Sequence, residues 1–378
     1  MNFELNDDEK MLVETAQSFV KKESPVSRAR KLRDDETGWD RAVWKKMGEL
    51  GWMSLPFPES VGGFGGSFAD VSLIVDQLGT TLVPEPYVES VLLAGMAILR
   101  SGSAAQQERL LAPMIAGETS LALAALERTS RYDVTAVDTR AEKAGEGWTL
   151  KGEKYFVLNG HAADHLVVSA RTSGKHGERN GISLFAVGKD AAGLKIQRVK
   201  MMDGRHAAIV MLEGAAGELL GAEGAAAPVL DEVMDLGAAA ACAEGNGIMR
   251  TVLWMTVEYL RTREQFGVKI GTFQALQHRA VDMFIETELA KSTSILAAIK
   301  ASAPADERAY EISKAKAQLT ASGHFVVREG TQLHGGIGVT DEHDIGLYFK
   351  RMQMLGALHG DQDFHLQRFS SMPQFTAL

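Results

Sequence analysis

The spacing of apolar residues changes twice along this chain, and these changes constrain the fold more than any other feature. Residues 7–22 carry apolar side chains three and four positions apart, as on one face of an amphipathic helix. Residues 119–222 instead hold short runs of alternating and β-branched residues, separated by Gly, Asn and Asp. Helical spacing returns near residue 225 and persists. The pattern predicts an α+β chain with helices, strands and helices in that order.

A chain of 378 residues is too long for one ordinary core, so we expect several domains. The pattern predicts an N-terminal all-α domain at residues 1–117, a middle β-sandwich or barrel domain at 118–224 and a C-terminal four-helix bundle at 225–378. Further N-terminal helices are expected at 39–50, 68–78, 88–100 and 105–116, around a Pro- and Gly-rich loop at 55–66. Strands are expected at 120–125, 136–141, 147–150, 155–158, 165–169, 182–186, 194–199 and 208–212. The C-terminal helices are expected at 228–262, 273–302, 307–333 and 341–358.

Charge and cysteine usage exclude several classes of protein. The net charge of −9 argues against binding to nucleic acid or to an anionic membrane surface. Cys242 is the only cysteine, so the chain forms no internal disulfide and no Cys-rich metal site, which fits a reducing compartment. The acidic, polar N-terminus is not a signal peptide, and no run of about 18 apolar residues predicts a transmembrane helix. We therefore expect a cytoplasmic protein without a metal.

Two segments of the C-terminal region carry the most specific motifs. Residues 259–274 read Tyr-Leu-Arg-Thr-Arg-Glu-Gln-Phe-Gly-Val-Lys-Ile-Gly-Thr-Phe-Gln, and residues 332–340 read Gln-Leu-His-Gly-Gly-Ile-Gly-Val-Thr. Arg263 follows a long predicted helix, where its guanidinium fork can grip a pyrophosphate. Gly335 and Gly336 let a backbone approach a phosphate-bearing ligand closely. The alternatives are a solvated cation at a helix end for Arg263 and a helix C-cap with a tight turn for the glycines.

These paired segments closely resemble the two hallmark segments of the acyl-CoA dehydrogenases, a family of FAD flavoproteins. Residues 56–66 and 152–160 also look like that family, so the resemblance covers essentially the whole chain. It implies FAD as cofactor and an acyl-CoA substrate. The residues at the family's FAD-binding positions are Arg263, Phe266, Gln274, Gln332, Gly335 and Gly336. In the family these segments bind the FAD of a neighbouring subunit, which implies an oligomer.

The family's reaction is α,β-dehydrogenation: a base removes the α-proton of the thioester, and the β-hydrogen leaves as hydride to the flavin, giving a trans-2-enoyl-CoA. The usual base is a glutamate that precedes a glycine, but His359 stands at that position, before Gly360. A second known base position falls on Gly237. The backbone N–H of His359 remains able to donate a hydrogen bond to the thioester oxygen, because that role needs no particular side chain.

Three residues are candidates for the missing base. Glu244 lies two helical turns beyond Gly237, in an otherwise apolar stretch where loss of hydration would raise its pKa. The alternative is a structural carboxylate that braces a subunit contact. His359 is the second candidate, with an exposed or hydrogen-bonded histidine as its alternative. Asp361 is the third, although the resemblance places a cofactor contact at its position.

The middle domain departs from the family as well. Where members often have Thr-Glu-Pro-Gly-Ala-Gly-Ser-Asp beside the flavin and thioester, residues 126–133 match only at Glu127 and Asp133. A flavin-contacting Trp-x-Thr becomes Phe156-Val-Leu158, in which Phe156 can still stack on a ring but Leu158 cannot hydrogen-bond. A CoA-gripping arginine becomes Ala238. These changes predict an altered acyl pocket or an incomplete site.

Such losses resemble bacterial family members with a His-Gly-Asp-x-x-x-His segment, several of which pair in α2β2 heterotetramers acting on bulky steroid side-chain CoA esters. The resemblance implies a homologous partner subunit, or a homodimer or homotetramer, with an electron-transfer flavoprotein as acceptor. Three functions stay open. The chain is an active acyl-CoA dehydrogenase of lipid β-oxidation or steroid degradation, a non-catalytic subunit that completes a partner's FAD site, or an acyl-CoA oxidase-like flavoenzyme.

Overall fold

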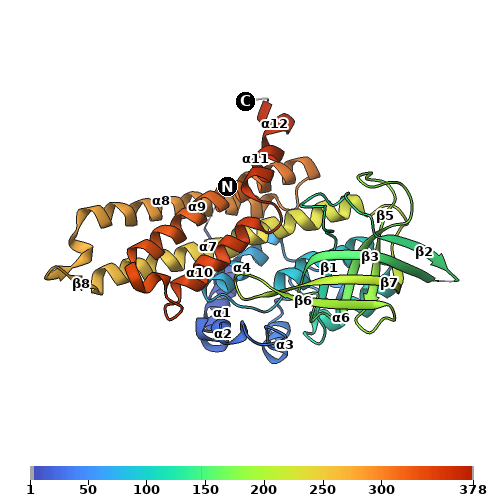
Figure 1. Cartoon of the computed structure of the whole chain (residues 1–378), viewed down its shortest axis with the longest axis horizontal. Coiled ribbons are helices and arrows are strands. Elements are labelled where there is room, and N and C mark those ends of the chain that lie inside the picture. Colours follow the sequence, from blue (N-terminus) through green and yellow to red (C-terminus); the bar gives the residue numbers. More distant parts are fainter. Residues whose placement is uncertain (1–3, 146, 377–378) are drawn as a thin grey trace. The chain divides into compact units, whose positions relative to one another are not determined.

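The computed structural model describes residues 4–145 and 147–376, which form two compact units (Figure 1). One unit, here the helical unit, consists of Met1–Lys31, Phe68–Val83 and Ala238–Leu378. The other, here the barrel unit, consists of Leu32–Ser67 and Pro84–Gly237. The predicted order of helices, strands and helices is confirmed, whereas the predicted domain limits at residues 117 and 224 stay a prediction.

Long helices build the helical unit. Its helices are α1 (Asp7–Glu23), most of α2 (Val26–Leu32), α4 (Phe68–Thr80), most of α7 (Ala227–Thr262), α8 (Gln274–Lys300), α9 (Ala305–Leu333), α10 (Ile345–Ala357), α11 (Gln362–Ser370) and α12 (Pro373–Thr376). Glycines allow the central helices to pack closely: an added Cβ on Gly245 of α7 would lie 2.5 Å from Leu319 of α9, and one on Gly323 of α9 would lie 2.4 Å from Met352 of α10. The four predicted C-terminal helices correspond to α7, α8, α9 and α10, and the shorter α2, α11 and α12 were missed.

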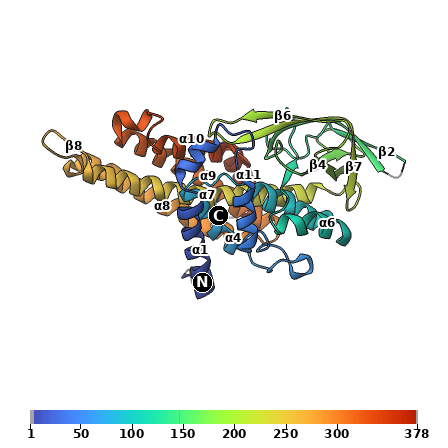
Figure 2. The same cartoon turned by 90° about the horizontal axis from the view of Figure 1, so that it is seen from below.

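Short connections shape one end of this unit. The segment after α7 forms the two-stranded hairpin β8 (Glu264–Gln265) and β9 (Val268–Lys269), followed by the 3-10 turn η3 (Ile270–Thr272). The segment after α9 forms a second 3-10 helix, η4 (Gly335–Val339). Figure 2 shows the hairpin at the extreme end of the unit, beyond the start of α8.

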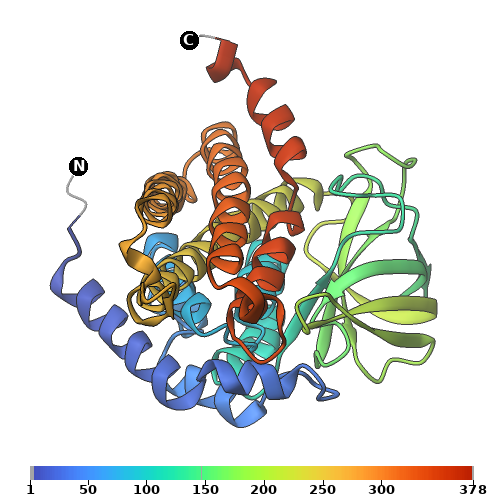
Figure 3. The same ribbon diagram turned by 60° about the vertical axis from the view of Figure 1, so that its left-hand side comes forward.

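The barrel unit combines a helical part with a closed sheet (Figure 3). Its helices are α3 (Arg41–Glu49), η1 (Glu59–Val61), the π-helical η2 (Val88–Gly95), α5 (Met96–Ser101) and α6 (Ala104–Ile115). Its strands are β1 (Leu121–Ala124), β2 (Arg140–Ala144), β3 (Gly147–Leu158), β4 (His165–Arg171), β5 (Ile182–Gly188), β6 (Leu194–Lys200) and β7 (His206–Leu220). The helix predicted at residues 88–100 is a π-helical stretch that continues as α5.

The strand pairings close on themselves. β4 pairs with β2 on one edge and with β5 on the other, and β2–β3, β3–β7 and β7–β5 pairs complete the circuit. β1 extends the pairing of β4, and β6 pairs with β7 outside the circuit. Of the two architectures that the sequence predicted, the barrel is therefore the correct one. Its interior holds apolar side chains from most strands, including Leu150, Val168, Phe185, Val210 and Leu212.

Two strand predictions were wrong at the level of detail. β2 begins only at Arg140, because the backbone before it is engaged elsewhere: Val137 accepts a hydrogen bond from Arg171, and the N–H groups of residues 138 and 139 donate to Glu127. The predicted strands 147–150 and 155–158 form one strand, β3, interrupted by register shifts. Phe156 sits at the second shift with φ +55°, a left-handed conformation that is uncommon for an aromatic residue.

A buried ion pair joins β3 to the loop before β2. Lys154 is fully buried, and its Nζ lies 2.7 Å from Oε1 of Glu127 and 3.0 Å from Oγ of Ser169. Burial lowers the pKa of Lys154 to about 8, while Glu127 acts in the opposite direction. Burial tends to raise the pKa of Glu127, but Lys154 and the two backbone N–H groups outweigh it, so the net shift is downward. Both groups therefore stay charged at neutral pH.

We expect Lys154→Met to lower the free energy of unfolding by about 3–5 kcal/mol, because it leaves the Glu127 carboxylate buried without its counter-charge. Urea unfolding followed by circular dichroism measures the change. Lys195→Met is the matched control, since Lys195 pairs with Glu213 at the surface, where an ion pair contributes about 0–1 kcal/mol. Equal losses of unfolding free energy in the two variants would show that the buried ion pair stabilises the fold no more than the surface pair does.

Candidate active site

The two hallmark segments meet at one end of the helical unit. Arg263 directly follows α7, and its backbone N–H still donates to the carbonyl of Tyr259 at 2.8 Å. The Tyr259 ring stacks on His334, with ring centroids 4.5 Å apart. His334 is the residue between α9 and η4, so this contact brings the end of α7 to the end of α9. The structure therefore places the Arg263 segment next to the Gln332–Gly336 segment.

The predicted FAD-contacting residues in and beside the two hallmark segments lie at the surface. Phe266 is 91% exposed at the tip of the β8–β9 hairpin, where it and Gly267 take positive φ values of +57° and +77°. Gly335 and Gly336 have no other atom within 4 Å of the place where a Cβ would stand. Arg263, Gln274 and Gln332 are exposed as well. This surface offers a cation, an aromatic face and bare backbone, which fit the pyrophosphate and rings of FAD.

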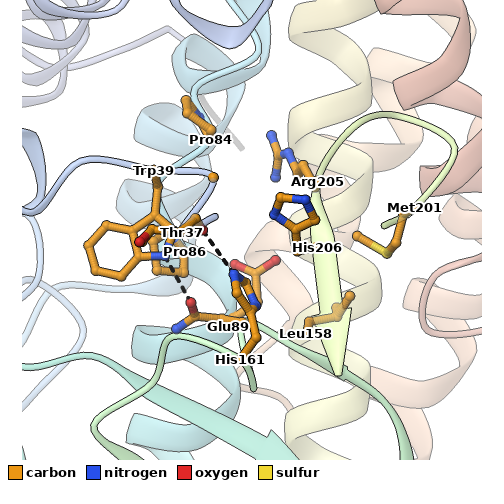
Figure 4. A pocket seen from close by; sticks show the side chains of 12 residues that line it. Thr37, Trp39, Pro84, Pro86, Glu89, Leu158, His161, Met201, Arg205 and His206 are labelled. Atoms are coloured by element: carbon orange, nitrogen blue, oxygen red, sulfur yellow. Dashed lines mark hydrogen bonds between the residues drawn. The ribbon is translucent and has the colours of Figure 1, made fainter. Parts of the chain in front are cut away.

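The barrel unit carries one further predicted FAD contact, Phe156. Phe156 is 44% exposed at the irregular end of β3, so its ring is available to a planar ligand. Leu158 lines a pocket of the same unit together with residues from three other segments, among them Trp39, Glu89 and His206 (Figure 4). Asn159 is fixed at the wall of this pocket, because its Oδ1 accepts a hydrogen bond of 3.0 Å from the Trp39 ring.

Glu244 does not lie in the apolar surroundings that the sequence suggested. Its carboxylate forms two charge-assisted hydrogen bonds with Arg351 of α10, Oε1 to Nε and Oε2 to Nη2, each 2.7 Å long. Both side chains are buried, with 5% and 4% of their residues' surfaces exposed. The pair links α7 to α10 across 107 positions of sequence. The expectation of an isolated carboxylate is therefore wrong, while the role of Glu244 as a base stays a prediction.

The loop after α10 carries His359 and is held from inside. The Nζ of Lys316, a fully buried residue of α9, donates to the carbonyls of Gly360 at 2.8 Å and Gly356 at 3.2 Å. His365 Nε2 donates to the carbonyl of His359 at 2.9 Å. His359 itself takes φ +56°, so the chain reverses at this residue. These contacts fix the backbone of the loop whose N–H the resemblance assigns to the thioester oxygen.

Burial, and then the charges around this loop, keep its histidines neutral. Burial, followed by Lys316 and Arg351, lowers the pKa of His359 to about 3. Burial and Lys316 likewise lower the pKa of His365 to about 3. Asp361 caps α11, since its Oδ1 accepts a hydrogen bond of 2.9 Å from the N–H of Phe364. The cofactor contact predicted for Asp361 stays a prediction.

Sequence reasoning missed Arg351 and Lys316, the two cations that surround the candidate bases. Lys316 interrupts an apolar helical face, with buried Ile312 and Leu319 four positions before and three positions after it. Arg351 similarly lies between the buried Tyr348 and Leu355 of α10. The helical period predicts an apolar residue at both positions, so a charged residue there is the signal from which the sequence could have identified them. Such a charged residue indicates that its side chain is buried, but it does not identify the residue that the side chain contacts.

The neutral histidines make stability depend on pH. The folded-state pKa values of His359 and His365 lie below the value of about 6.5 for an unfolded chain, so the unfolded state binds protons first. Their contribution to stability is present above pH 6.5 and is lost as the pH falls toward 3. We expect urea midpoints to fall between pH 7 and pH 4, and to fall less steeply in His365→Asn. An unchanged slope in that variant would contradict the assignment.

No group of three or more His, Cys, Asp and Glu side chains within residues 4–145 and 147–376 is arranged to hold a metal ion. Across those same ranges, every helix is too short or too polar to cross a bilayer.

Comparison with known proteins matches the chain along nearly its whole length. Residues 6–118, 122–213 and 223–370 match the profiles of the acyl-CoA dehydrogenase N-terminal, middle and C-terminal domains. The acyl-CoA dehydrogenase IpdE2 of Mycobacterium tuberculosis is 31% identical over 346 residues, which cover 91% of each chain.

Solved structures give the same result. The Tcur3481–Tcur3483 steroid ACAD shares 29% identity at a TM-score of 0.86, covering 98% of this chain and 99% of that one. The ChsE4–ChsE5 complex from Mycobacterium tuberculosis shares 27% identity at a TM-score of 0.87, covering 98% of both chains. With all three domains matched in order, the chain belongs to the acyl-CoA dehydrogenase family and is an FAD-dependent oxidoreductase.

Proposed function

We propose that this chain is one subunit of a heteromeric acyl-CoA dehydrogenase, in which a homologous partner subunit supplies the catalytic base. The observation that carries this proposal is the bidentate Glu244–Arg351 pair. Proton transfer to Glu244 would neutralise the carboxylate and weaken its two short charge-assisted hydrogen bonds with the buried Arg351. Glu244 therefore serves as the structural carboxylate that was the alternative reading of the sequence.

His359 is a poor substitute for the missing glutamate. A general base works best when its pKa lies near the operating pH, and the pKa of His359 is about 3. Its backbone N–H is a better contribution, since the loop is fixed by Lys316 and His365 and can stabilise charge on a thioester oxygen. In this proposal the chain binds and orients the substrate, and the partner removes the α-proton.

An uncovered apolar stripe supports an oligomer. On α8, apolar residues at helical spacing are about half exposed: Val281 at 54%, Phe284 at 47%, Ile285 at 48% and Leu289 at 48%. An exposed stripe of this kind marks a protein–protein contact, and the same unit carries the exposed Arg263 and Phe266. We propose that a homologous subunit covers α8 and that the hallmark segments complete its FAD site. When bound, FAD accepts the hydride from the substrate.

The proposed substrate is a bulky acyl-CoA of the steroid type, and the proposed acceptor is an electron-transfer flavoprotein. Support for the substrate comes from similarity to the Tcur3481–Tcur3483 steroid ACAD and from the changed residues Phe156 and Leu158 on the barrel unit. Support for the acceptor is the family resemblance alone. An absorption spectrum of the chain, purified alone and with a co-expressed homologous subunit, tests the assembly: flavin absorbance only in the co-expressed form is expected.

A pair of substitutions separates a structural Glu244 from a catalytic one. We expect Glu244→Gln and Arg351→Gln, each in the assembled complex, to lower the unfolding midpoint alike and to change the rate of flavin bleaching by acyl-CoA alike. Removal of a general base lowers the rate of flavin bleaching by about 100-fold or more. Arg351→Gln leaves the Glu244 carboxylate in place, so this variant would not show such a loss if Glu244 were the base. A selective loss of bleaching in Glu244→Gln would assign the base to this chain and refute the partner proposal.

The predicted contact between Arg263 and FAD can be tested with Arg261 as the control residue. We expect Arg263→Ala to reduce the flavin-to-protein absorbance ratio of the complex, because it removes a bidentate cation from the proposed pyrophosphate contact. Arg261, also exposed and two positions earlier, should tolerate the same change without loss of flavin. Equal flavin content in both variants would remove Arg263 from the cofactor site.

A further inference from the structure

The proposed function leaves one buried charge without a chemical role, that of Lys316 on α9. The residue has none of its surface exposed, and its Nζ donates hydrogen bonds to the carbonyl oxygens of Gly360 at 2.8 Å and Gly356 at 3.2 Å. Among the residues that the structure describes, no carboxylate lies within 4 Å of this Nζ, and Asp361 acts on it from farther away. The positive charge of Lys316 is therefore directed at backbone carbonyls and is not cancelled by an ion-pair partner.

The carbonyls that Lys316 binds lie at the C-terminal end of α10. Gly356 is in the last turn of that helix, which spans Ile345–Ala357, and Gly360 follows three residues beyond it. The C-terminal end of a helix carries a partial negative charge of about half an electron, because its last carbonyls have no partner within the helix. On its own, this end of α10 would repel an anion at the residues that follow. A protonated Lys316 bound to the same end reverses the sign of the local charge.

The N–H group that the proposed function directs at the thioester oxygen belongs to this turn. His359 lies two residues beyond α10, and within the described part of the chain its backbone N–H has no hydrogen-bond acceptor. The carbonyl of His359 is bound by His365 at 2.9 Å, and the next carbonyl is bound by Lys316. These contacts hold the turn by its carbonyl groups and leave the N–H available to a ligand.

The histidines of the loop indicate the sign of the electrostatic potential there. Burial has the largest effect on the pKa of His359 and His365, and Lys316 has the next largest and lowers both. A potential that disfavours a cationic imidazole favours an anionic oxygen at the same place. Arg351 acts on His359 in the same direction, but Arg351 is paired with Glu244. Lys316 is thus the cation without a paired carboxylate that makes the potential at this turn positive.

Lys316 changes its charge in a pH range in which its neighbours stay neutral. It acts electrostatically on titratable groups from α7, α9, the loop and α11, which are Cys242, His324, His359, Asp361 and His365. Burial raises the pKa of the Cys242 thiol to about 12 and lowers the pKa of each of the three histidines. The thiol and the imidazoles therefore stay neutral from pH 7 to pH 9.5, whereas Lys316, whose pKa burial lowers to about 8, loses its proton in that range.

We propose that Lys316 is a positioning residue for the dehydrogenation: its ammonium cancels the negative end of α10, so that the potential at the His359 N–H favours the negative charge that develops on the thioester oxygen. This inference rests on the proposed function, because it takes that N–H to bind the thioester. Lys316 acts through the loop rather than by contact with the substrate. A lysine that only held the loop would serve equally well as a neutral amine, which still donates two hydrogen bonds.

An acyl-CoA analogue with sulfur in place of its β-carbon tests the role of the charge in the assembled complex. This analogue can lose its α-proton to the base but has no β-hydrogen to transfer, so it stops as an anion that gives a long-wavelength absorption band beside oxidised flavin. We expect the pH midpoint of this band to rise by about one unit in Lys316→Met, a tenfold loss of anion stabilisation. Lys314→Met is the matched control, because Lys314 lies on the same helix and pairs with Glu311, and it should leave the midpoint in place. An unchanged midpoint in Lys316→Met would overturn the inference and leave the proposed function intact.

A measurement on the unaltered complex covers the case in which Lys316→Met fails to fold. The infrared stretching frequency of a bound trans-2-enoyl-CoA, labelled with ¹³C at the thioester carbonyl, depends on the potential at that oxygen. We expect this frequency to rise between pH 7 and pH 9.5, because Lys316 loses its charge but keeps its hydrogen bonds. A constant frequency over this range would show that Lys316 only holds the loop. If neither the analogue nor the enoyl-CoA binds to the complex, the inference and the proposed function both fail.

Discussion

The Glu244–Arg351 ion pair connects the two helices from which the candidate active-site segments extend. α7 leads into the Arg263 segment, and α10 leads into the His359 loop, so one buried contact sets the relation between both. A bidentate pair tolerates little displacement, because each charge depends on the other for solvation. The same contact occupies the only carboxylate of this helix stretch, between Asp235 and Arg250. This structural role of Glu244 is the basis of the proposal that a partner subunit supplies the base.

The His359 loop is fixed by contacts to its backbone. Lys316 and His365 bind carbonyls on either side of the turn, and a positive φ at His359 directs the chain through it. These contacts involve only backbone atoms of the loop, so they persist whatever side chain occupies the base position. The geometry of the N–H donor can therefore survive the loss of the glutamate. A subunit of this kind fits an enzyme whose chemical roles are divided between homologous chains.

The two buried lysines, Lys154 and Lys316, stabilise the structure in the same way. Lys154 lies inside the barrel unit and Lys316 inside the helical unit, and both have a pKa lowered to about 8 by burial. Each is retained because it satisfies several acceptors at once: a carboxylate and a hydroxyl for Lys154, and two carbonyls for Lys316. An apolar residue of the same size would leave those acceptors unsatisfied. Both lysines thus fix loops.

The sequence by itself determined the order of helices and strands and the family, because both depend on local spacing and on short motifs. It also placed Arg263 and Gly335 correctly at helix ends, since capping and helix termination are local. It left open whether the strands form a sandwich or a barrel, and the closing pair β4–β5 decided this.

The partner of Glu244, the contacts of Lys316 and the low pKa of His359 came only from the tertiary structure. Each depends on a residue far away in the chain, as Arg351 lies 107 positions from Glu244 and Gly360 lies 44 positions from Lys316. The spacing of apolar residues shows which side of a helix or strand is buried, but it does not show which residues that side contacts.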